Sequence, residues 1–367
     1  MRIFRFRIIL SSALILLLVL FPQLGFSDHN AQSIGISPRK AADYIHNVIE
    51  AGRTIYSEVI VERLGATISL PSTENWETED TLPLPAQFLM MSSQTPQVKR
   101  MGMSYRLMSL WAINKRNGPR SEFDKKGLEA TARNPKKPYT EIVSIKGKRF
   151  FKALYPDKAV TKACVTCHNN HPKSPKTDFK LGDVMGGILI NLPLGEVKRN
   201  GNHEEDLIPP EVVSDYIHSV LDSDRTVDSQ YIVNRLQEKN IVYASENWWE
   251  ENTLLLPAQF LLNESELILN KKSGPDFKLI SLWPINDHNG AANEFERLGL
   301  EYVVRHPFRP FIGSIKIGGK QFFQAVYADL AVSPACISCH NAHPKSPRKD
   351  FKLNDVMGGI LLTFPLD

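Results

Sequence analysis

A five-residue pattern, Cys-x-x-Cys-His, occurs twice in the chain and uses all four of its cysteines. The pattern supplies the thiols of Cys164, Cys167, Cys336 and Cys339 and the imidazoles of His168 and His340. This spacing is typical of covalent attachment of a c-type haem. Two thiols about one turn apart can bond the two vinyl groups along one porphyrin edge, and the adjacent imidazole can bind the iron. The sequence therefore predicts two covalently attached haems (iron protoporphyrin IX), with His168 and His340 as proximal iron ligands.

Paired cysteines also occur in three other kinds of site. A thioredoxin-like redox pair opens a helix after a strand and does not require a following histidine. A structural zinc site pairs two such motifs about 15 to 20 residues apart, whereas these two are 172 residues apart. Disulfide bonds in an exported protein stay open as an alternative. The histidine directly after each pair favours haem attachment.

The N-terminal 27 residues have the pattern of a secretory signal peptide. Three arginines precede an apolar run over residues 8–21, and Gly25-Phe26-Ser27 leads to the polar Asp28. Residues 8–26 are barely long enough to span a bilayer, so an uncleaved membrane anchor is the alternative. No later stretch is apolar enough to cross a membrane. Because c-type haem is attached outside the bacterial inner membrane, we expect a periplasmic protein.

The charge of the chain excludes one class of partner. Removal of Arg2, Arg5 and Arg7 with the signal peptide would lower the formal charge from +4 to +1. Four haem propionates would then make the mature protein slightly acidic. A slightly negative net charge is not typical of a nucleic-acid-binding protein, which has a basic surface. We therefore expect no nucleic-acid partner.

The chain is a tandem repeat with a constant offset of 172 residues. Residues 43–46, Asp-Tyr-Ile-His, recur at 215–218, and residues 84–88, Leu-Pro-Ala-Gln-Phe, recur at 256–260. The predicted organisation is a signal peptide over 1–27, one domain over 28–194, a polar linker over 195–210 and a second domain over 211–367. Each copy is much longer than a solenoid repeat and is large enough to bury a core of its own.

Each copy has an α+β pattern. In the first, apolar spacing predicts a helix over about 37–64 and a second over 122–133. Residues 141–155 predict a β-hairpin that turns at Lys146-Gly147, and the second copy has Gly318-Gly319 at that turn. Residues 187–192 predict a closing strand. The cysteine motif is expected in the intervening loop, held by Pro172 and Pro175.

These elements together resemble the PAS-like c-type haem domain of exported bacterial and cyanobacterial proteins, long catalogued as a domain of unknown function. The resemblance covers nearly all of both copies. In the first it rests on Ser109-Leu110, Asn114, Asn117, Glu122-Phe123, Phe150-Phe151, the haem motif and the segment 182–186. The second copy departs from it at Asn354, which replaces the glycine before Asp355. The resemblance implies two PAS-like domains, each an antiparallel sheet flanked by helices with one haem c.

The second axial ligand of each iron is not fixed by the motif. In at least part of the resembling family a cysteine occupies that position, but here all four cysteines are used. If the two haems are ligated alike, the ligands occupy matched positions. Only three pairs qualify among the ten histidines and eight methionines: His46 with His218, His171 with His343, and Met185 with Met357.

The three pairs are not equivalent. His171 follows the proximal histidine by three residues, so it cannot easily reach the opposite haem face and reads as a turn residue before Pro172. Met185 enters a strand, where an apolar core role is more usual. His46 and His218 are therefore the preferred distal candidates, with Met185 and Met357 as the alternative. A solvated helix position is the simplest interpretation of Arg53 and Arg225, although either could bind a propionate.

The leading functional prediction is an exported dihaem c-type cytochrome that transfers electrons to redox partner proteins. The alternative is a periplasmic haem-based redox or small-gas sensor that acts through a membrane signalling partner. A third possibility, a haem enzyme such as a peroxidase, has no distal acid–base group beyond His46. No nucleophile–base pair, phosphate loop or acidic metal cluster recurs in both copies, so we expect no catalytic residues and no enzyme activity.

Overall fold

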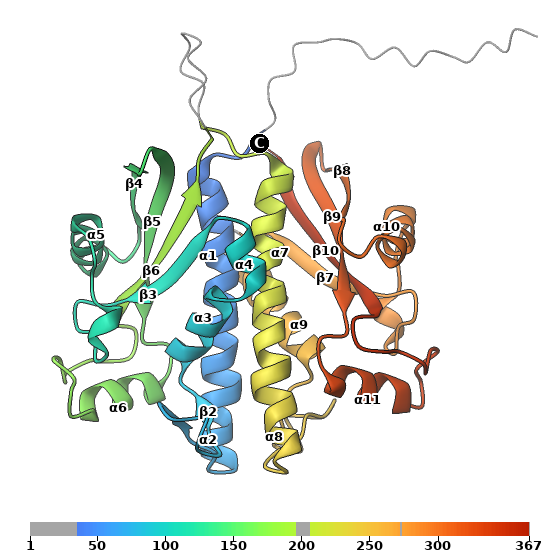
Figure 1. Cartoon of the computed structure of the whole chain (residues 1–367), viewed down its shortest axis with the longest axis horizontal. Helices are drawn as coiled ribbons and strands as arrows, with labels where there is room; N and C mark the ends of the chain where they lie inside the picture. Colours follow the sequence, from blue (N-terminus) through green and yellow to red (C-terminus); the bar gives the residue numbers. More distant parts are fainter. Residues whose placement is uncertain (1–34, 196–205, 272–273, 367) are drawn as a thin grey trace, which may run out of the picture. The chain divides into compact units, whose positions relative to one another are not determined.

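In the computed structural model, the first repeat begins with one long helical run and ends with a four-stranded sheet (Figure 1). The structure describes residues 35–195, 206–271 and 274–366, so the predicted signal peptide and most of the predicted linker lie outside the described residues. The elements of the first repeat are α1 (Pro38–Ile55), the π-helical η1 (Tyr56–Glu62), α2 (Arg63–Thr67), β1 (Ser72–Thr73), β2 (Leu82–Pro83), α3 (Pro85–Ser93), α4 (Pro96–Arg100), β3 (Ser104–Met108), η2 (Lys115–Asn117), α5 (Glu122–Arg133), β4 (Tyr139–Ile145), β5 (Lys148–Lys158), α6 (Lys162–Asn170) and β6 (Val184–Pro193).

The second repeat has the same main elements in the same order. They are α7 (Pro210–Val227), the π-helical η3 (Asp228–Asn234), α8 (Arg235–Glu238), α9 (Pro257–Lys271), β7 (Asp276–Ile280), η4 (Asp287–Asn289), α10 (Glu294–Arg305), β8 (Phe311–Ile317), β9 (Lys320–Leu330), α11 (Pro334–Ala342) and β10 (Val356–Leu366). None of the helices described is both long enough and apolar enough to span a bilayer.

Each repeat folds its sheet in the same way. The strand orders are β3-β6-β5-β4 and β7-β10-β9-β8, and every neighbouring pair in these two sheets is antiparallel. The predicted α+β class, with an antiparallel sheet flanked by helices in each repeat, is therefore confirmed. The helix predicted over 122–133 is α5, and the predicted hairpin is the β4–β5 pair.

The turn between β4 and β5 has both central residues in the left-handed region, with φ of 50° at Lys146 and 77° at Gly147. The matched turn has φ of 57° at Gly318 and 82° at Gly319. Positive φ at both positions is the property of a type I′ turn, whose twist suits a two-residue hairpin. Glycine at both positions makes the second turn the less strained of the two.

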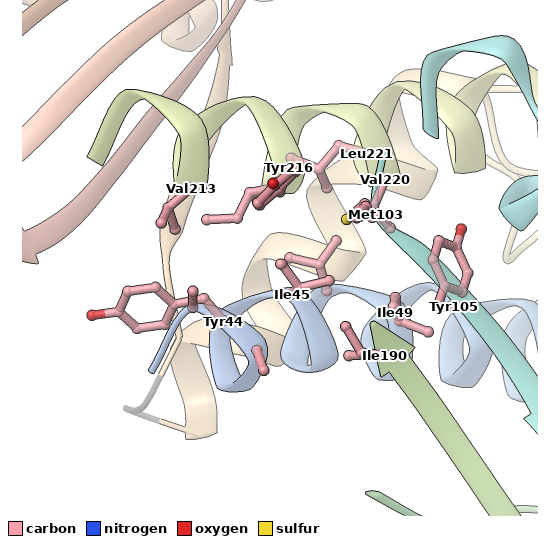
Figure 2. Close-up of a cluster of buried hydrophobic side chains, with 14 of the residues drawn as sticks. Tyr44, Ile45, Ile49, Met103, Tyr105, Ile190, Val213, Tyr216, Val220 and Leu221 are labelled. Carbon is pink, nitrogen blue, oxygen red and sulfur yellow. The ribbon is translucent and has the colours of Figure 1, made fainter. Parts of the chain in front are cut away.

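The largest apolar cluster joins the two repeats. It lies between α1 and α7, which pack side by side, and includes residues of β3 and β6 (Figure 2). Ile45 and Ile49 of α1 lie opposite Val213 and Val220 of α7 in this cluster. Although each copy is long enough for a core of its own, the described residues of both repeats pack as one unit.

The two repeats also exchange equivalent polar contacts. Arg63 donates to the carbonyl oxygens of Trp248 and Thr253, and its guanidinium lies 4.9 Å from the Trp248 ring centroid. At positions shifted by 172, Arg235 donates to the carbonyls of Trp76 and Thr81 and lies 5.0 Å from the Trp76 ring. An interface is isologous when both copies use the same surface, so that each contact occurs twice with the roles of the two copies exchanged. The duplicated domains therefore associate as a symmetric dimer would.

Candidate functional site

Both Cys-x-x-Cys-His motifs lie on short helices, α6 and α11, that follow the long central strands β5 and β9 (Figure 1). The prediction of a loop was therefore wrong. The helix α6 begins because the Thr161 hydroxyl accepts a hydrogen bond from the Cys164 amide, and it ends at His171, just before Pro172. Neither helix contains a fully buried residue. Without a buried stripe there is no hydrophobic period to detect, and only the cap and the proline mark these helices in the sequence.

The helix puts the three reactive side chains of each motif on one face. Cys164 and Cys167 are three residues apart, and His168 is four residues after Cys164, so all three are neighbours on the helix surface. The thiols are accessible, since Cys167 is exposed and Cys164 is partly exposed. Such an arrangement can present two thiols and one imidazole to the same planar group.

The structure bears on the alternative uses of the cysteines. All four are free thiols, and the described residues contain no group of three or more acidic, histidine or cysteine side chains placed to hold a metal ion. A helix after a strand is also the setting of a thioredoxin-like pair. Burial, with the nearby Glu74, raises the pKa of Cys167, the second cysteine of its pair. Burial, with the nearby Glu246, likewise raises the pKa of Cys339.

An apolar cluster lies against each motif helix. In the first repeat Met185, Phe179 and Ala159 are buried together, with Trp111, Cys164 and Val165 packed against them. In the second repeat the members are Met357, Phe351, Ala331, Trp283, Cys336 and Ile337. The structure therefore brings the predicted alternative ligands, Met185 and Met357, close to the motif cysteines.

A side-chain amide holds the following loop against α6. Asn169 donates to the Phe179 carbonyl at 2.9 Å and accepts from the Phe179 amide at 2.9 Å, and Asn341 makes the same pair of bonds with Phe351. The Phe179 ring then meets the His168 ring edge-on, with centroids 5.9 Å apart. This contact fixes the imidazole plane relative to the apolar cluster.

The predicted proximal histidines each have a buried nitrogen without a described partner. The Nδ1 atoms of His168 and His340 are buried and have no hydrogen-bond partner within the described residues. Burial of a polar atom without a partner costs about 1–3 kcal/mol. Both motifs share this feature, and a bound group that used or covered the imidazole would account for it. The donor set, the accessible thiols and the unpaired imidazoles thus fit a covalently attached haem.

The preferred distal candidates lie in a different environment. His46 stacks on Tyr155 with centroids 3.9 Å apart, and His218 stacks on Tyr327 at the same distance. Desolvation lowers the pKa of both histidines to about 4, and the Nε2 atom of each is buried without a described partner. Arg53, the α1 side chain that acts electrostatically on His168, lies two helical turns beyond His46. Assignment of His46 and His218 as ligands stays a prediction.

The third pair forms turns, as its sequence position suggested. The Nδ1 atom of His171 accepts a hydrogen bond from the Lys173 amide at 3.1 Å, and His343 accepts one from Lys345 at 3.2 Å. The Nε2 atom of His343 lies 3.2 Å from a carboxylate oxygen of Glu246. These contacts close the turn after each motif helix.

The two repeated arginines are buried, so the solvated interpretation of Arg53 and Arg225 was wrong. Arg53 forms an ion pair of 2.6 Å with Asp157, and both side chains are 7% exposed. It also donates to the Lys158 carbonyl at 3.0 Å. The partner follows Arg53 by 104 residues, and no local pattern in the sequence shows that pairing. The arginine therefore ties α1 to the end of β5, just before the motif helix.

Comparison with known proteins identifies the family of the chain. A family model described as Tll0287-like matches residues 31–193 and again residues 211–365. The chain belongs to the Tll0287-like family. The two matches also confirm the tandem duplication predicted from the constant 172-residue offset. No curated protein and no solved structure matches the chain.

In the second repeat of this Tll0287-like chain, Asn354 replaces the glycine of the first repeat, and the backbone conformation explains why asparagine is tolerated. Gly182 has φ of 86°, and Asn354, at the matched position, has φ of 70°. Asparagine tolerates the left-handed region better than most residues. The turn before β10 therefore keeps its backbone conformation without the glycine.

The π-helical segments η1 and η3 are features that sequence reasoning missed. Each continues the long first helix of its repeat for seven residues. Both adjoin a motif helix, since Glu62 accepts from the Lys162 amide and α11 packs against η3. π-Helical turns are frequent at functional sites. Apolar periodicity does not separate them from an α-helix, so the sequence carried no usable signal.

Proposed function

We propose that the chain is an exported c-type cytochrome that binds two haems and transfers electrons in the periplasm. The observation that carries this proposal is the placement of Cys164, Cys167 and His168 on one face of α6, repeated on α11. The histidine directly after each cysteine pair, which a redox dithiol does not require, disfavours that competing use.

The side chains that would hold each haem are those of the motif. Cys164 and Cys167 would bond the first porphyrin, Cys336 and Cys339 the second, and His168 and His340 would bind the irons. The bound group supplies one-electron transfer between its ferrous and ferric states. The chain itself positions the site. Asn169 and Phe179 hold the loop beside the His168 ring, and Trp111 packs against the Phe179 ring of the apolar cluster. Arg53 and Asp157 hold the strand end from which α6 starts.

Haem content tests the proposal directly. The full-length protein, expressed with a c-type haem maturation system, should retain two haems per chain after denaturation and acid–acetone extraction. Replacement of Cys164 and Cys167 by alanine should leave one covalent haem, and replacement of all four cysteines should leave none. Loss of all haem from the denatured wild-type protein would contradict the proposal.

A second measurement separates electron transfer from sensing. The carrier is expected to have six-coordinate haems, and its ferrous spectrum should not change with carbon monoxide. A spectrum that shifts on addition of carbon monoxide would instead favour the gas-sensor alternative, because an open iron position allows gas binding.

A further inference from the structure

The ion pairs near the two motif helices differ at matched positions. In the first repeat, Arg53 pairs with Asp157 at 2.6 Å, and Glu50 pairs with Lys271 of the second repeat at 2.6 Å. Two cations and two anions therefore balance one another near the first motif.

The second repeat lacks one of those cations. Arg225 lies 3.1 Å from a carboxylate oxygen of Asp222 and 3.1 Å from one of Asp329. Asp222, which matches Glu50, receives its other side-chain contact from the uncharged amide of Gln97. Lys99 occupies the position that matches Lys271, but no described ion pair joins it to Asp222. One cation therefore faces two anions near the second motif.

Both charge sets lie at the strand ends that lead into the motif helices. Asp157, the partner of Arg53, is near the end of β5, which precedes α6, and Asp329, a partner of Arg225, is near the end of β9, which precedes α11. The additional anion therefore lies on the side of the second motif.

Exposed substitutions do not offset this difference. The exposed Lys158 and Lys162 of the first repeat have uncharged counterparts in the second, but so do Glu58 and Glu62. These changes cancel in charge. Two further differences, Thr177 against Lys349 and Lys115 against Asp287, involve exposed side chains. Charges in solvent are screened over about 8–10 Å at physiological salt, whereas buried and partly buried pairs are screened much less.

We propose that the two haem sites are electrostatically inequivalent, and that the haem bound at His340 has the lower reduction potential. The proposal rests on the proposed haem binding. Its physical reason is that the unbalanced carboxylate of Asp222 and Asp329 stabilises the ferric state, which carries one more positive charge than the ferrous state. The same axial residues occur at matched positions, so the charge set is what distinguishes the sites.

The inequivalence gives electron transfer within the chain a direction. An electron on the second haem moves to the first, so the iron at His340 is oxidised from ferrous to ferric while the iron at His168 is reduced from ferric to ferrous. No proton or further reactant is needed for this step. A donor is therefore expected to reduce the second repeat, and an acceptor to oxidise the first.

A spectroscopic redox titration of the intact dihaem protein tests the proposal. We expect two one-electron waves whose equilibrium constants for reduction differ by about tenfold or more, which corresponds to 59 mV for a one-electron couple. Asp222→Asn should raise the midpoint potential of the lower wave toward that of the upper wave. Lys271→Gln should lower the midpoint potential of the upper wave. The double variant should bring the waves together or invert their order. Asp350→Asn, which changes an exposed carboxylate on the loop after α11, is the control and should move neither wave.

Assignment of the waves uses the attachment cysteines. A variant with Cys336 and Cys339 replaced by serine should keep only the upper wave, and where that variant does not mature, the wave displaced by Asp222→Asn identifies the second haem. A single wave in the wild-type protein, or an Asp222→Asn variant with unchanged potentials, would overturn the proposal. Neither result would affect the haem count, which tests the proposed function separately.

Discussion

The candidate sixth ligands differ in what their side chains contact. Met185 is buried against Cys164 and Val165 of the motif helix, whereas His46 is stacked on Tyr155 of the sheet. Arg53, the α1 residue that acts electrostatically on His168, follows His46 by seven positions, or about 10 Å along the helix axis. Proximity therefore favours Met185, although the unpaired nitrogen belongs to His46.

We expect Met185→Ala to change the visible spectrum of one ferrous haem and to make it reactive toward carbon monoxide. His46→Ala should leave the haem spectrum unchanged, because its ring lies away from the motif helix. It should lower the stability of the protein by about 2 kcal/mol, since it removes a buried aromatic stack. Spectra with and without carbon monoxide and urea unfolding measure the two effects. The opposite spectral result would assign His46, and Met357→Ala and His218→Ala repeat the comparison in the second repeat.

At the scale of single residues, the sequence predicted which side chains form the candidate site better than it predicted the environment of buried charges. Cys164, Cys167 and His168 are recognisable because their spacing is local and depends on the geometry of one helical turn. The burial of Arg53 was not recognisable, because its carboxylate partner Asp157 comes from a strand 104 residues away. Ion pairs that only tertiary packing creates leave no periodic pattern in the chain.

Two glycines of the first helical run provide a matched pair of substitutions. A Cβ atom at Gly52 of α1 would lie 2.3 Å from Oε1 of Glu264 and 2.6 Å from Oδ2 of Asp224. At Gly65 of α2 the nearest atom would be 3.7 Å away, which is ordinary contact. Gly52 therefore makes room for the second repeat, and Gly65 does not.

Gly52→Ala should destabilise the protein by about 2 kcal/mol or more, because the buried carboxylates have no free space. Gly65→Ala should stabilise it by about 0.5–1 kcal/mol, since alanine restricts the unfolded chain and favours the helix. Urea unfolding of the two variants checks both signs. Equal effects at the two positions would contradict the close approach at Gly52.

The β4–β5 hairpin gives a second test at the scale of an element. Lys146 holds a φ of 50°, which disfavours a long side chain, whereas Gly318 occupies the matched position in the other repeat. Lys146→Asn should raise the thermal midpoint modestly, by stabilising the turn by about 0.5 kcal/mol, because asparagine is preferred in type I′ turns. Gly318→Lys should have the reverse effect. Differential scanning calorimetry of both variants measures the change.

Elements with a strong period or turn signal were predictable, and those without one were not. The limits of α5 and the register of the β4–β5 hairpin follow from apolar spacing and from the turn residues. The helix α6 has no buried residue, so its cysteines and histidine appeared to lie in a loop. The change from α1 to the π-helical η1 is hidden for a different reason, since both segments bury one continuous apolar stripe.

At the scale of the whole molecule, the seam between the repeats departs from symmetry at a cluster of buried acids. Asp224, Asp228 and Glu264 of the second repeat are fully or almost fully buried. The matched positions in the first repeat are Gly52, Tyr56 and Ser92. The Ser92 hydroxyl donates to Asp224 and lies 2.7 Å from the Tyr105 hydroxyl. Duplication within one chain permits this difference, since the two sides of the seam evolve separately.

The acid cluster makes stability depend on pH. Desolvation raises the pKa of Asp228 to about 8, with a smaller effect from Asp224, and desolvation also raises the pKa of Asp224 and of Glu264. The folded state therefore keeps protons that the unfolded state releases near pH 4. The stabilisation from these carboxyls is complete below that pH and is lost as the pH rises through about 8.

The buried histidines act in the opposite sense at lower pH. His46 and His218 have a folded pKa of about 4, below their ordinary value of 6.5, so their contribution is present above pH 6.5 and is lost as the pH falls toward 4. Above about pH 7.5, one unit beyond the ordinary value, both histidines are almost entirely neutral in the folded and the unfolded state. In that window we expect the free energy of unfolding to fall with rising pH, by up to about 1.4 kcal/mol per pH unit for each carboxyl proton.

Urea unfolding at a series of pH values between about 7.5 and 8.5 measures this slope. Asp228→Asn should reduce it, because the amide keeps the shape of the carboxyl and carries no titratable proton. Asp350→Asn, at an exposed position, should leave the slope unchanged. A wild-type stability that stays constant or rises across this window would mean that the cluster is ionised in the folded state. The seam would then have to hold adjacent carboxylates without a cation, since the described contacts of Asp228 and Glu264 provide none. The direction of the slope therefore reports whether the two repeats are held together by protonated acids.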